Sequence, residues 1–201
     1  MGGFYEYFVL YKPCGYLSQF TPDHPGQKTL AELYPFPPEV YAVGRLDQDS
    51  EGLLLLTNDK SLNQFLLDPR HGHWRTYWVQ VEGFPDQTAL QKLATGVTIK
   101  VAGQLHNTRP CHVKIIPNPD VPPRTPPIRY RVHIPDTWVE LKLQEGKNRQ
   151  VRRMLAAVGY PVLRLVRVAL EDLQLELHKS GAVRKYDRAE IYNLLKLNRN
   201  Y

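Results

Sequence analysis

Three acidic residues stand close together just ahead of a run of leucines in this chain. Residues 44–59 read Gly-Arg-Leu-Asp-Gln-Asp-Ser-Glu-Gly-Leu-Leu-Leu-Leu-Thr-Asn-Asp, so Asp47, Asp49 and Glu51 precede the leucines at 53–56. A short apolar run between turn residues is typical of a buried strand. A carboxylate at the start of such a strand is held in place and partly removed from water, as acid–base or nucleophilic chemistry requires.

The spacing of these acids also fits part of a calcium-binding loop. Asp47, Asp49, Glu51 and Gly52 would take the first, third, fifth and sixth positions of such a loop. The twelfth position would be Asn58, where calcium loops carry a bidentate Glu, and a strand rather than a helix is expected next. Calcium is therefore disfavoured, and the remaining structural alternative is a polar turn capped by its own carboxylates.

A second group of charged residues lies in the segment Glu-Gly-Lys-Asn-Arg-Gln-Val-Arg-Arg-Met, residues 145–154. At helical spacing the apolar residues between 151 and 158 form one stripe, and Arg149, Arg152 and Arg153 form another beside it. Such a basic stripe is either a solvated helix face or a source of cations for a nearby carboxylate. A desolvated carboxylate needs a cation close by to stay ionised.

Size, charge and cysteine content narrow the class of protein. The 201 residues include 26 Lys and Arg against 20 Asp and Glu, and the formal charge of +6 favours a polyanionic partner. Cys14 and Cys111 are too few for a disulfide scaffold and are not spaced as zinc ligands, so no metal site is expected. Without a membrane-span-length apolar run or a secretory signal, a cytoplasmic protein with no membrane partner is expected.

The hydrophobic pattern predicts more strands than helices. Strands are expected at 5–11, 40–43, 53–56, 76–82, twice within 98–116, and at 138–143, 162–169 and 173–177. Helices are expected at 27–34, from a cap at Asn58 or Asp59 to 67, and at 85–94, 150–158 and 187–197. Residues 117–135 hold seven of the 17 prolines, which favours an ordered surface excursion over a ligand for a proline-binding module. The pattern favours an α+β fold, a mixed and largely antiparallel sheet flanked by helices.

Three ordered segments resemble the motifs of the pseudouridine synthase family, within its group of ribosomal RNA synthases. They are Gly-Arg-Leu-Asp at 44–47, Arg-Thr-Tyr at 75–77 and Gln-Val-Arg at 150–152, and the resemblance extends over residues 5–178. It implies the family's bent sheet, in which two lobes meet at a central cleft. It also implies a single catalytic domain over residues 1–201.

The resemblance implies an isomerase that converts a uridine of ribosomal RNA to pseudouridine. The N1–C1′ bond breaks and a C5–C1′ bond forms, with one carboxylate acting at the sugar as nucleophile or as base. Asp47 is the implied catalytic residue, and Arg152 is its implied cationic partner. Tyr77 is implied to stack on the target base and to approach the sugar. The reaction needs no metal and no cofactor.

Further residues are assigned to RNA binding by the same resemblance. Arg45 would fill the gap left by the extruded uridine; the alternative is an ion pair with Asp49 or Glu51. Lys12 belongs to a Lys-Pro-x-Gly turn that braces the cleft. Lys147, Arg149 and Arg153 are expected at RNA phosphates.

The segment Leu-Val-Arg at 165–167 resembles the family's apolar wall beneath the base. Leu165 would belong to this wall, and Arg167 would be a surface or phosphate contact. The family's Gly four residues after this Arg is replaced here by Glu171.

The predicted first strand begins close to Met1, which leaves no room for the small RNA-binding domain that many ribosomal RNA synthases carry before the catalytic one. This absence and the overall likeness favour large-subunit (23S) RNA as the substrate, and a monomer is the default expectation for the oligomeric state. Three alternatives stay open: the same reaction on small-subunit ribosomal RNA or tRNA, a non-catalytic RNA-binding factor in ribosome assembly, and a carbohydrate hydrolase, which the basic charge disfavours.

Overall fold

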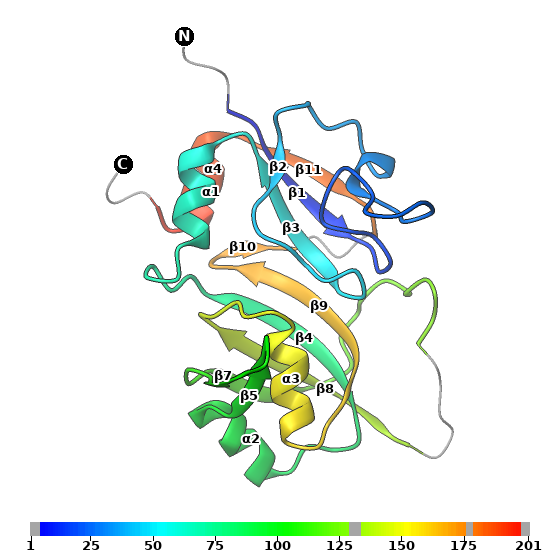
Figure 1. Cartoon of the computed structure of the whole chain (residues 1–201), viewed down its shortest axis with the longest axis vertical. Helices are drawn as coiled ribbons and strands as arrows, with labels where there is room; N and C mark the ends of the chain where they lie inside the picture. Colours follow the sequence, from blue (N-terminus) through cyan, green and yellow to red (C-terminus); the bar gives the residue numbers. More distant parts are fainter. Residues whose placement is uncertain (1–4, 129–133, 176–178, 198–201) are drawn as a thin grey trace.

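The computed structural model describes residues 5–128, 134–175 and 179–197 (Figure 1). Its strands are β1 (Tyr7–Lys12), β2 (Tyr41–Ala42), β3 (Glu51–Thr57), β4 (Arg75–Glu82), β5 (Thr98–Val101), β6 (Gln104–Asn107), β7 (His112–Ile116), β8 (Asp136–Leu143), β9 (Val162–Leu170), β10 (Leu173–Gln174) and β11 (Val183–Tyr186). Its helices are α1 (Lys60–Leu67), α2 (Gln87–Thr95), α3 (Gln150–Ala157) and α4 (Arg188–Leu194), with a 3-10 turn at Leu30–Glu32.

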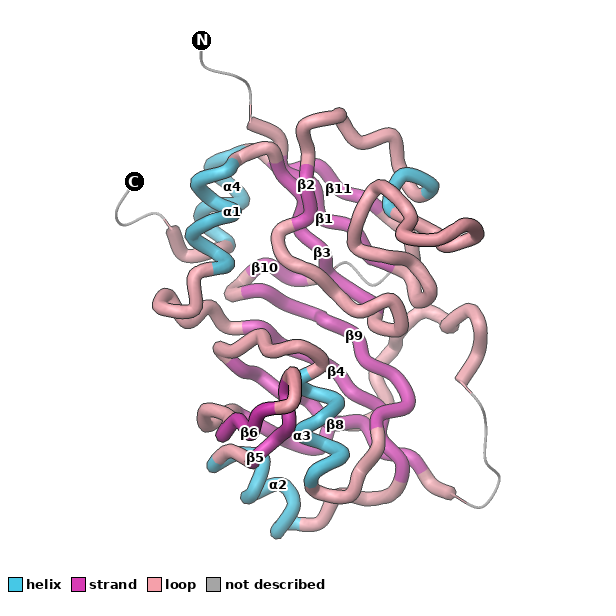
Figure 2. Tube along the Cα trace, viewed as in Figure 1, coloured by secondary structure: helices cyan, strands magenta, loops and turns pink. Residues whose placement is uncertain are grey.

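One long sheet runs through the whole molecule. Its strand order is β11-β1-β3-β9-β4-β8-β7, with β2 beside β3 and β10 beside β9. Among the described strands, β3 and β9 pair in parallel and the other neighbours pair antiparallel. Helices α1 and α4 lie at one half of the sheet, whereas α2, α3 and the β5–β6 hairpin lie at the other (Figures 1 and 2). The predicted α+β fold with a mixed, largely antiparallel sheet is confirmed.

The four leucines of β3 are buried because both faces of this strand are covered. Leu53 and Leu55 pack in a cluster with residues of α1 and α4, while Leu54 and Leu56 pack in a second cluster with Leu30. Successive side chains of a strand point to opposite faces, so a continuous apolar run is what a doubly covered strand requires. The loop that carries the acids therefore enters the sheet at a rigid position.

The other half of the sheet has its own core. Tyr77, Val79 and Val81 of β4 pack with β8 and with the apolar stripe of α3. The predicted stripe on residues 151–158 thus faces the sheet, which leaves the arginines of this helix at its edge. β4 lies between β9 and β8, so Tyr77 is held by strands on both sides.

Several predicted elements differ from the structure. The helix expected at 27–34 is only the 3-10 turn, because a capping box at Thr29 starts it and Pro35 follows shortly after. Residues 98–116 form three strands rather than two. The edge strand β11 was not predicted, since its polar residues hide the strand pattern. Predicted caps at Asp59 for α1 and at Gly96 after α2 are confirmed.

The proline-rich segment forms neither helix nor strand over residues 117–128, and Arg164 donates a hydrogen bond to the carbonyl oxygen of Pro122 at 2.8 Å. The remainder of this segment at 129–133, and the end of the strand predicted at 173–177, lie outside the described residues. Across the described parts of the chain, helices of a length and hydrophobicity that would cross a membrane are absent.

Candidate active site

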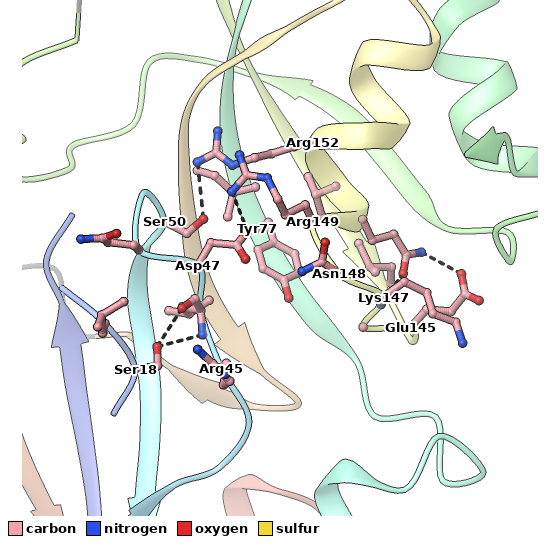
Figure 3. A pocket seen from close by; sticks show the side chains of 18 residues that line it. Ser18, Arg45, Asp47, Ser50, Tyr77, Glu145, Lys147, Asn148, Arg149 and Arg152 are labelled. Carbon is pink, nitrogen blue, oxygen red and sulfur yellow. Dashed lines mark hydrogen bonds and ion pairs between the residues drawn. The ribbon is translucent and has the colours of Figure 1, made fainter. Parts of the chain in front are cut away.

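The acidic turn and the start of α3 line one cavity of about 630 Å³ between the two halves of the sheet. Asp47 and Arg45 reach it from the loop before β3, Tyr77 from β4 and Arg152 from α3. Figure 3 shows these side chains around the same space, with Arg149 beside Asp47. Two of the three motif segments are distant in sequence from the first, and the sheet brings all three together.

Asp47 is held by the backbone of its own loop. The hydroxyl of Ser18 donates to the carbonyl oxygen of Leu46 at 2.8 Å and accepts from the Leu46 N–H at 3.0 Å, while the N–H of Ser50 donates to the Asp47 carbonyl at 3.0 Å. The Asp47 side chain is 32% exposed, so it is not fully buried: it is partly removed from water at the cavity wall. It is therefore open to a ligand from the cavity side.

Lys12 holds this loop in place through contacts with backbone carbonyl oxygens. Its Nζ donates to the carbonyl oxygens of Pro13 at 2.9 Å and Ser50 at 2.8 Å, and lies 3.5 Å from that of Gln48. The side chain is fully buried, and burial lowers the pKa of Lys12 to about 8. The predicted role in bracing the cleft fits these contacts. The assignment of Lys12 to RNA binding is wrong, because RNA cannot reach a buried ammonium.

Arg149, rather than Arg152, has the guanidinium closest to Asp47 among the ion pairs of this site. Nη1 of Arg149 lies 3.5 Å from Oδ2 of Asp47, and its two Nη atoms each lie 3.0 Å from an oxygen of Asp49. The residue has a left-handed backbone with φ of 52° directly before α3, which turns its side chain across the cavity. Two carboxylates hold Arg149 in the structure, and its expected contact with RNA phosphates stays a prediction.

Arg152 is held by the turn that follows Asp47. Its Nη2 donates to the Asp49 carbonyl oxygen at 2.9 Å and to Ser50 Oγ at 3.4 Å, and lies 3.4 Å from Oδ2 of Asp49. The predicted direct pairing of Arg152 with Asp47 is wrong in this structure. Arg152 therefore contacts the residues that follow Asp47 and not its carboxylate. Sequence reasoning also missed Asp49, the carboxylate that holds both arginines.

Asp49 and the arginines of this cluster influence one another's pKa values. Burial acts to raise the pKa of Asp49, but the hydrogen bonds from Arg149 and the charges of both arginines outweigh it and lower that pKa. The same hydrogen bond raises the pKa of Arg149, whereas burial lowers the pKa of Arg152. The cavity wall thus carries ionised acids and guanidiniums together, and it favours a reaction in which a carboxylate stays charged.

Tyr77 and Leu165 give the cavity an apolar part. Their exposed fractions are 8% and 4%, and both side chains line the cavity. They lie on the adjacent strands β4 and β9. A flat aromatic ring beside an aliphatic side chain is a suitable surface for a planar base.

Comparison with known proteins identifies the family. A model of the RNA pseudouridylate synthase family matches residues 6–157, a span that contains all three motif segments. The chain belongs to this family. A ribosomal large subunit pseudouridine synthase E from Xanthomonas axonopodis is 54% identical over 84% of this chain and 87% of its own length. A ribosomal large subunit pseudouridine synthase B from Bacillus subtilis is 34% identical over 94% of this chain and 70% of its own length.

A solved structure agrees with this assignment. The crystal structure of a pseudouridylate synthase superposes with a TM-score of 0.77 at 27% identity, over 94% of this chain and 74% of the other. The mixed sheet described above is therefore the pseudouridine synthase fold. This chain is a pseudouridine synthase, an RNA-modifying isomerase.

In this synthase Arg167 is not a surface residue, contrary to prediction. It is 6% exposed, and its Nε donates to the carbonyl oxygen of Leu53 at 2.7 Å. A hydrogen bond also joins Arg167 to Tyr77, and burial lowers the pKa of this arginine. Arg167 therefore links β9 to β3 and helps to hold the side chain of Tyr77 in place.

The structure shows how Glu171 is accommodated at the position where the family has a glycine. Glu171 has a φ of 50°, the left-handed conformation that glycine adopts most readily. Its backbone N–H donates to the carbonyl oxygen of Trp74, and its Oε1 accepts from the Trp74 N–H at 2.8 Å. These two hydrogen bonds hold a conformation that is otherwise unfavourable for Glu.

The remaining predicted RNA-binding residues occupy different places. Arg45 is exposed, lines the cavity and donates to Gln19 Oε1 at 3.3 Å. The alternative pairing of Arg45 with Glu51 is wrong, because Glu51 is bound by Arg164 at 2.8 Å. The pairing with Asp49 is likewise not the one observed, since the arginines of α3 hold that acid.

Lys147 and Arg153 lie on opposite sides of the α3 N-terminus. Lys147 is exposed and lines the cavity, as expected of a phosphate contact. Arg153 is directed toward the carbonyl oxygen of Lys100 and toward Asn148 Oδ1 at 3.2 Å, and it does not line the cavity. Within the described residues, His, Cys, Asp and Glu side chains do not gather in threes as metal ligands.

Proposed function

We propose that this synthase converts a uridine of large-subunit ribosomal RNA to pseudouridine, with Asp47 as its catalytic residue. The observation that carries the proposal is the position of Asp47, half-buried in a cavity that Tyr77 also lines and beside the guanidinium of Arg149. Relatives at 48–54% identity are ribosomal large subunit pseudouridine synthases of type E.

The cavity supplies what the isomerisation requires of a protein. The extruded uracil stacks on Tyr77 and contacts Leu165, while the sugar faces Asp47. The carboxylate acts at the sugar, as nucleophile at C1′ or as base at C2′. The N1–C1′ bond breaks, the uracil turns, and C5 bonds to C1′. N1 gains a proton and C5 loses one, so the product is an isomer of the substrate.

The two arginines have different roles in this proposal. Arg149 lies directly beside the catalytic carboxylate and stabilises its charge. Arg152 fixes the turn from 49 to 50 and so keeps Asp47 at the cavity wall. The exposed Arg45 fills the space that the uridine leaves in the RNA, and Lys147 contacts a phosphate.

We further propose that the enzyme acts as a cytoplasmic monomer without a cofactor. The reaction rearranges one nucleotide and needs no electron or group donor.

The test is release of label from RNA that carries tritium at uridine C5. Unmodified transcripts of large- and small-subunit ribosomal RNA are incubated with the wild type and with Asp47→Asn. We expect release only from the large-subunit transcript and only by the wild type, while both proteins bind this RNA equally well. Turnover by Asp47→Asn at the wild-type rate would exclude the assigned residue, and release from the small-subunit transcript alone would exclude the assigned substrate.

A further inference from the structure

A second cavity of about 510 Å³ adjoins the candidate active site. The two cavities share Arg45, Tyr77, Lys147, Glu145 and Gly146 as lining residues, so they form consecutive compartments of one cleft. The second compartment extends past Leu66–Pro69 at the end of α1 to His106 and Asn107 of β6 and to Arg109. Its volume falls in the range of about 300–1,000 Å³ that small-molecule sites occupy.

This compartment is strongly basic. Five Lys and Arg side chains line it against two acids, Asp68 and Glu145; the basic residues are Arg45, Arg75, Arg109, Lys147 and Arg167. Both acids are already engaged. Asp68 is held by Arg70, with both carboxylate oxygens within 3.0 Å of its Nε. An anion that enters the compartment therefore meets cations whose charge the local acids do not cancel.

A network of hydrogen bonds surrounds Glu145, one of the residues that line the compartment. This carboxylate accepts from the Arg109 N–H at 2.9 Å and from Gln150 Nε2 at 2.7 Å, and it lies 3.1 Å from Nε2 of His106. The side chain is 8% exposed, and its partners join the β5–β6 hairpin to the start of α3. Burial acts to raise the pKa of Glu145, but these hydrogen bonds lower it. The loop that carries Lys147 is thereby fixed to the wall that carries Arg109.

Two of the basic residues are committed to the protein itself. Arg75 donates to the carbonyl oxygens of Leu66 at 3.1 Å and His73 at 3.2 Å, and Arg167 is buried. They contribute charge but do not need to touch a ligand. Arg109 and Lys147 are exposed, and they are the side chains placed to contact one directly.

We propose that the second compartment binds the nucleotide adjacent to the target uridine, with its phosphate held by Arg109 and Lys147. The inference rests on the proposed function and deepens it, because the RNA strand that enters the first compartment must continue past Tyr77 and Arg45. These two residues line both compartments, so a strand that leaves the target uridine passes directly into the second. Arg109 then contributes to RNA affinity without taking part in the chemistry.

The test compares Arg109→Gln with Lys92→Gln in proteins that also carry Asp47→Asn, so that the RNA is bound but not converted. Lys92 is an exposed lysine of α2 that lines neither compartment, so its loss removes the same charge elsewhere. The Arg109 side chain can be replaced without breaking the contact with Glu145, which uses the backbone N–H. The probe is the unmodified large-subunit ribosomal RNA transcript, bound at several salt concentrations.

We expect Arg109→Gln to weaken binding about fivefold at 0.1 M salt and to reduce the slope of log K against log salt by roughly one phosphate contact. Lys92→Gln should change affinity less than twofold. Equal affinities and salt slopes for the two variants would overturn the proposal.

The proposed function is tested separately in the wild-type background by tritium release. Release by the wild type, together with equal binding by the two variants, would overturn the subsite and leave the proposed function standing. Absence of release, together with weaker binding by Arg109→Gln, would overturn the proposed function and leave the second compartment as an RNA-binding site that is not tied to a target uridine.

Discussion

Nη1 of Arg149 lies 3.5 Å from Oδ2 of Asp47, while the same guanidinium holds both oxygens of Asp49 at 3.0 Å. Asp49 thereby anchors Arg149 beside the proposed catalytic acid, and it also receives Arg152 at 3.4 Å. Asp49 thus holds Arg149 beside the proposed catalytic acid and Arg152 against the turn that follows it. The arrangement keeps Asp47 near positive charge and leaves it accessible from the cavity.

The three arginines of this segment should differ in their effect on activity. Arg149→Ala and Arg152→Ala should each lower kcat about 100-fold, because removal of one preorganised electrostatic contact in an active site has effects of this order. Arg153→Ala should stay within about threefold of wild type, since its side chain is directed to Lys100. Single-turnover tritium release measures all three. Equal losses of kcat for Arg152→Ala and Arg153→Ala would contradict the assignment of Arg152 to the active site.

The buried Lys12 should make stability depend on alkaline pH. Its folded pKa of about 8 is below its ordinary value near 10.4, so between these values the unfolded chain holds more protons and stability rises with pH. Relative to Lys12→Met, the wild type should gain about 2 kcal/mol between pH 8 and 10. Urea unfolding of both proteins at these pH values measures the gain. A constant difference would show that the ammonium is not desolvated.

Gly52 should not tolerate a side chain. A Cβ atom there would lie 2.3 Å from the Arg167 carbonyl oxygen, and the φ of Gly52 is 106°. Gly52→Ala should therefore destabilise the protein by at least about 3 kcal/mol, because β3 and β9 must separate or the backbone must strain. Gly146→Ala is the control, since a Cβ atom there meets nothing within 4 Å. Equal shifts of the unfolding temperature in Gly52→Ala and Gly146→Ala would contradict the proposed clash between position 52 and the backbone of Arg167.

Removal of only one partner of the Glu51–Arg164 ion pair should strongly destabilise the folded protein. Both side chains are buried, and two hydrogen bonds of 2.8 Å join them. Glu51→Ala should cost about 3–5 kcal/mol, because it leaves a buried guanidinium uncompensated. The double replacement of both residues by Met should cost less than Glu51→Ala alone. Chemical denaturation of the wild type and the two variants decides this, and a double replacement that costs as much as Glu51→Ala would argue against the penalty for an uncompensated guanidinium.

The amino-acid sequence by itself determined the elements and the place of the acid. Period-two alternation marked β4 and β8, helical spacing marked α3, and Asp59 and Gly96 marked helix ends. These signals are local, because side-chain direction repeats within each element. The motif segments likewise placed Asp47 at the entry of a buried strand, where it is found. The polar strand β11 was missed because its pattern is too weak to stand out, and β2 is shorter than the strand predicted at 40–43.

Only the tertiary structure decided which charged groups meet. Arg149 rather than Arg152 reaches Asp47 because the backbone of Arg149 is left-handed before α3, and no spacing rule predicts this. Lys12 and Arg167 looked like RNA contacts but are buried, because strand pairing places each beside backbone carbonyl oxygens that it satisfies. A side chain's type is local information. Its partner and its exposure depend on how segments about a hundred residues apart pack against one another.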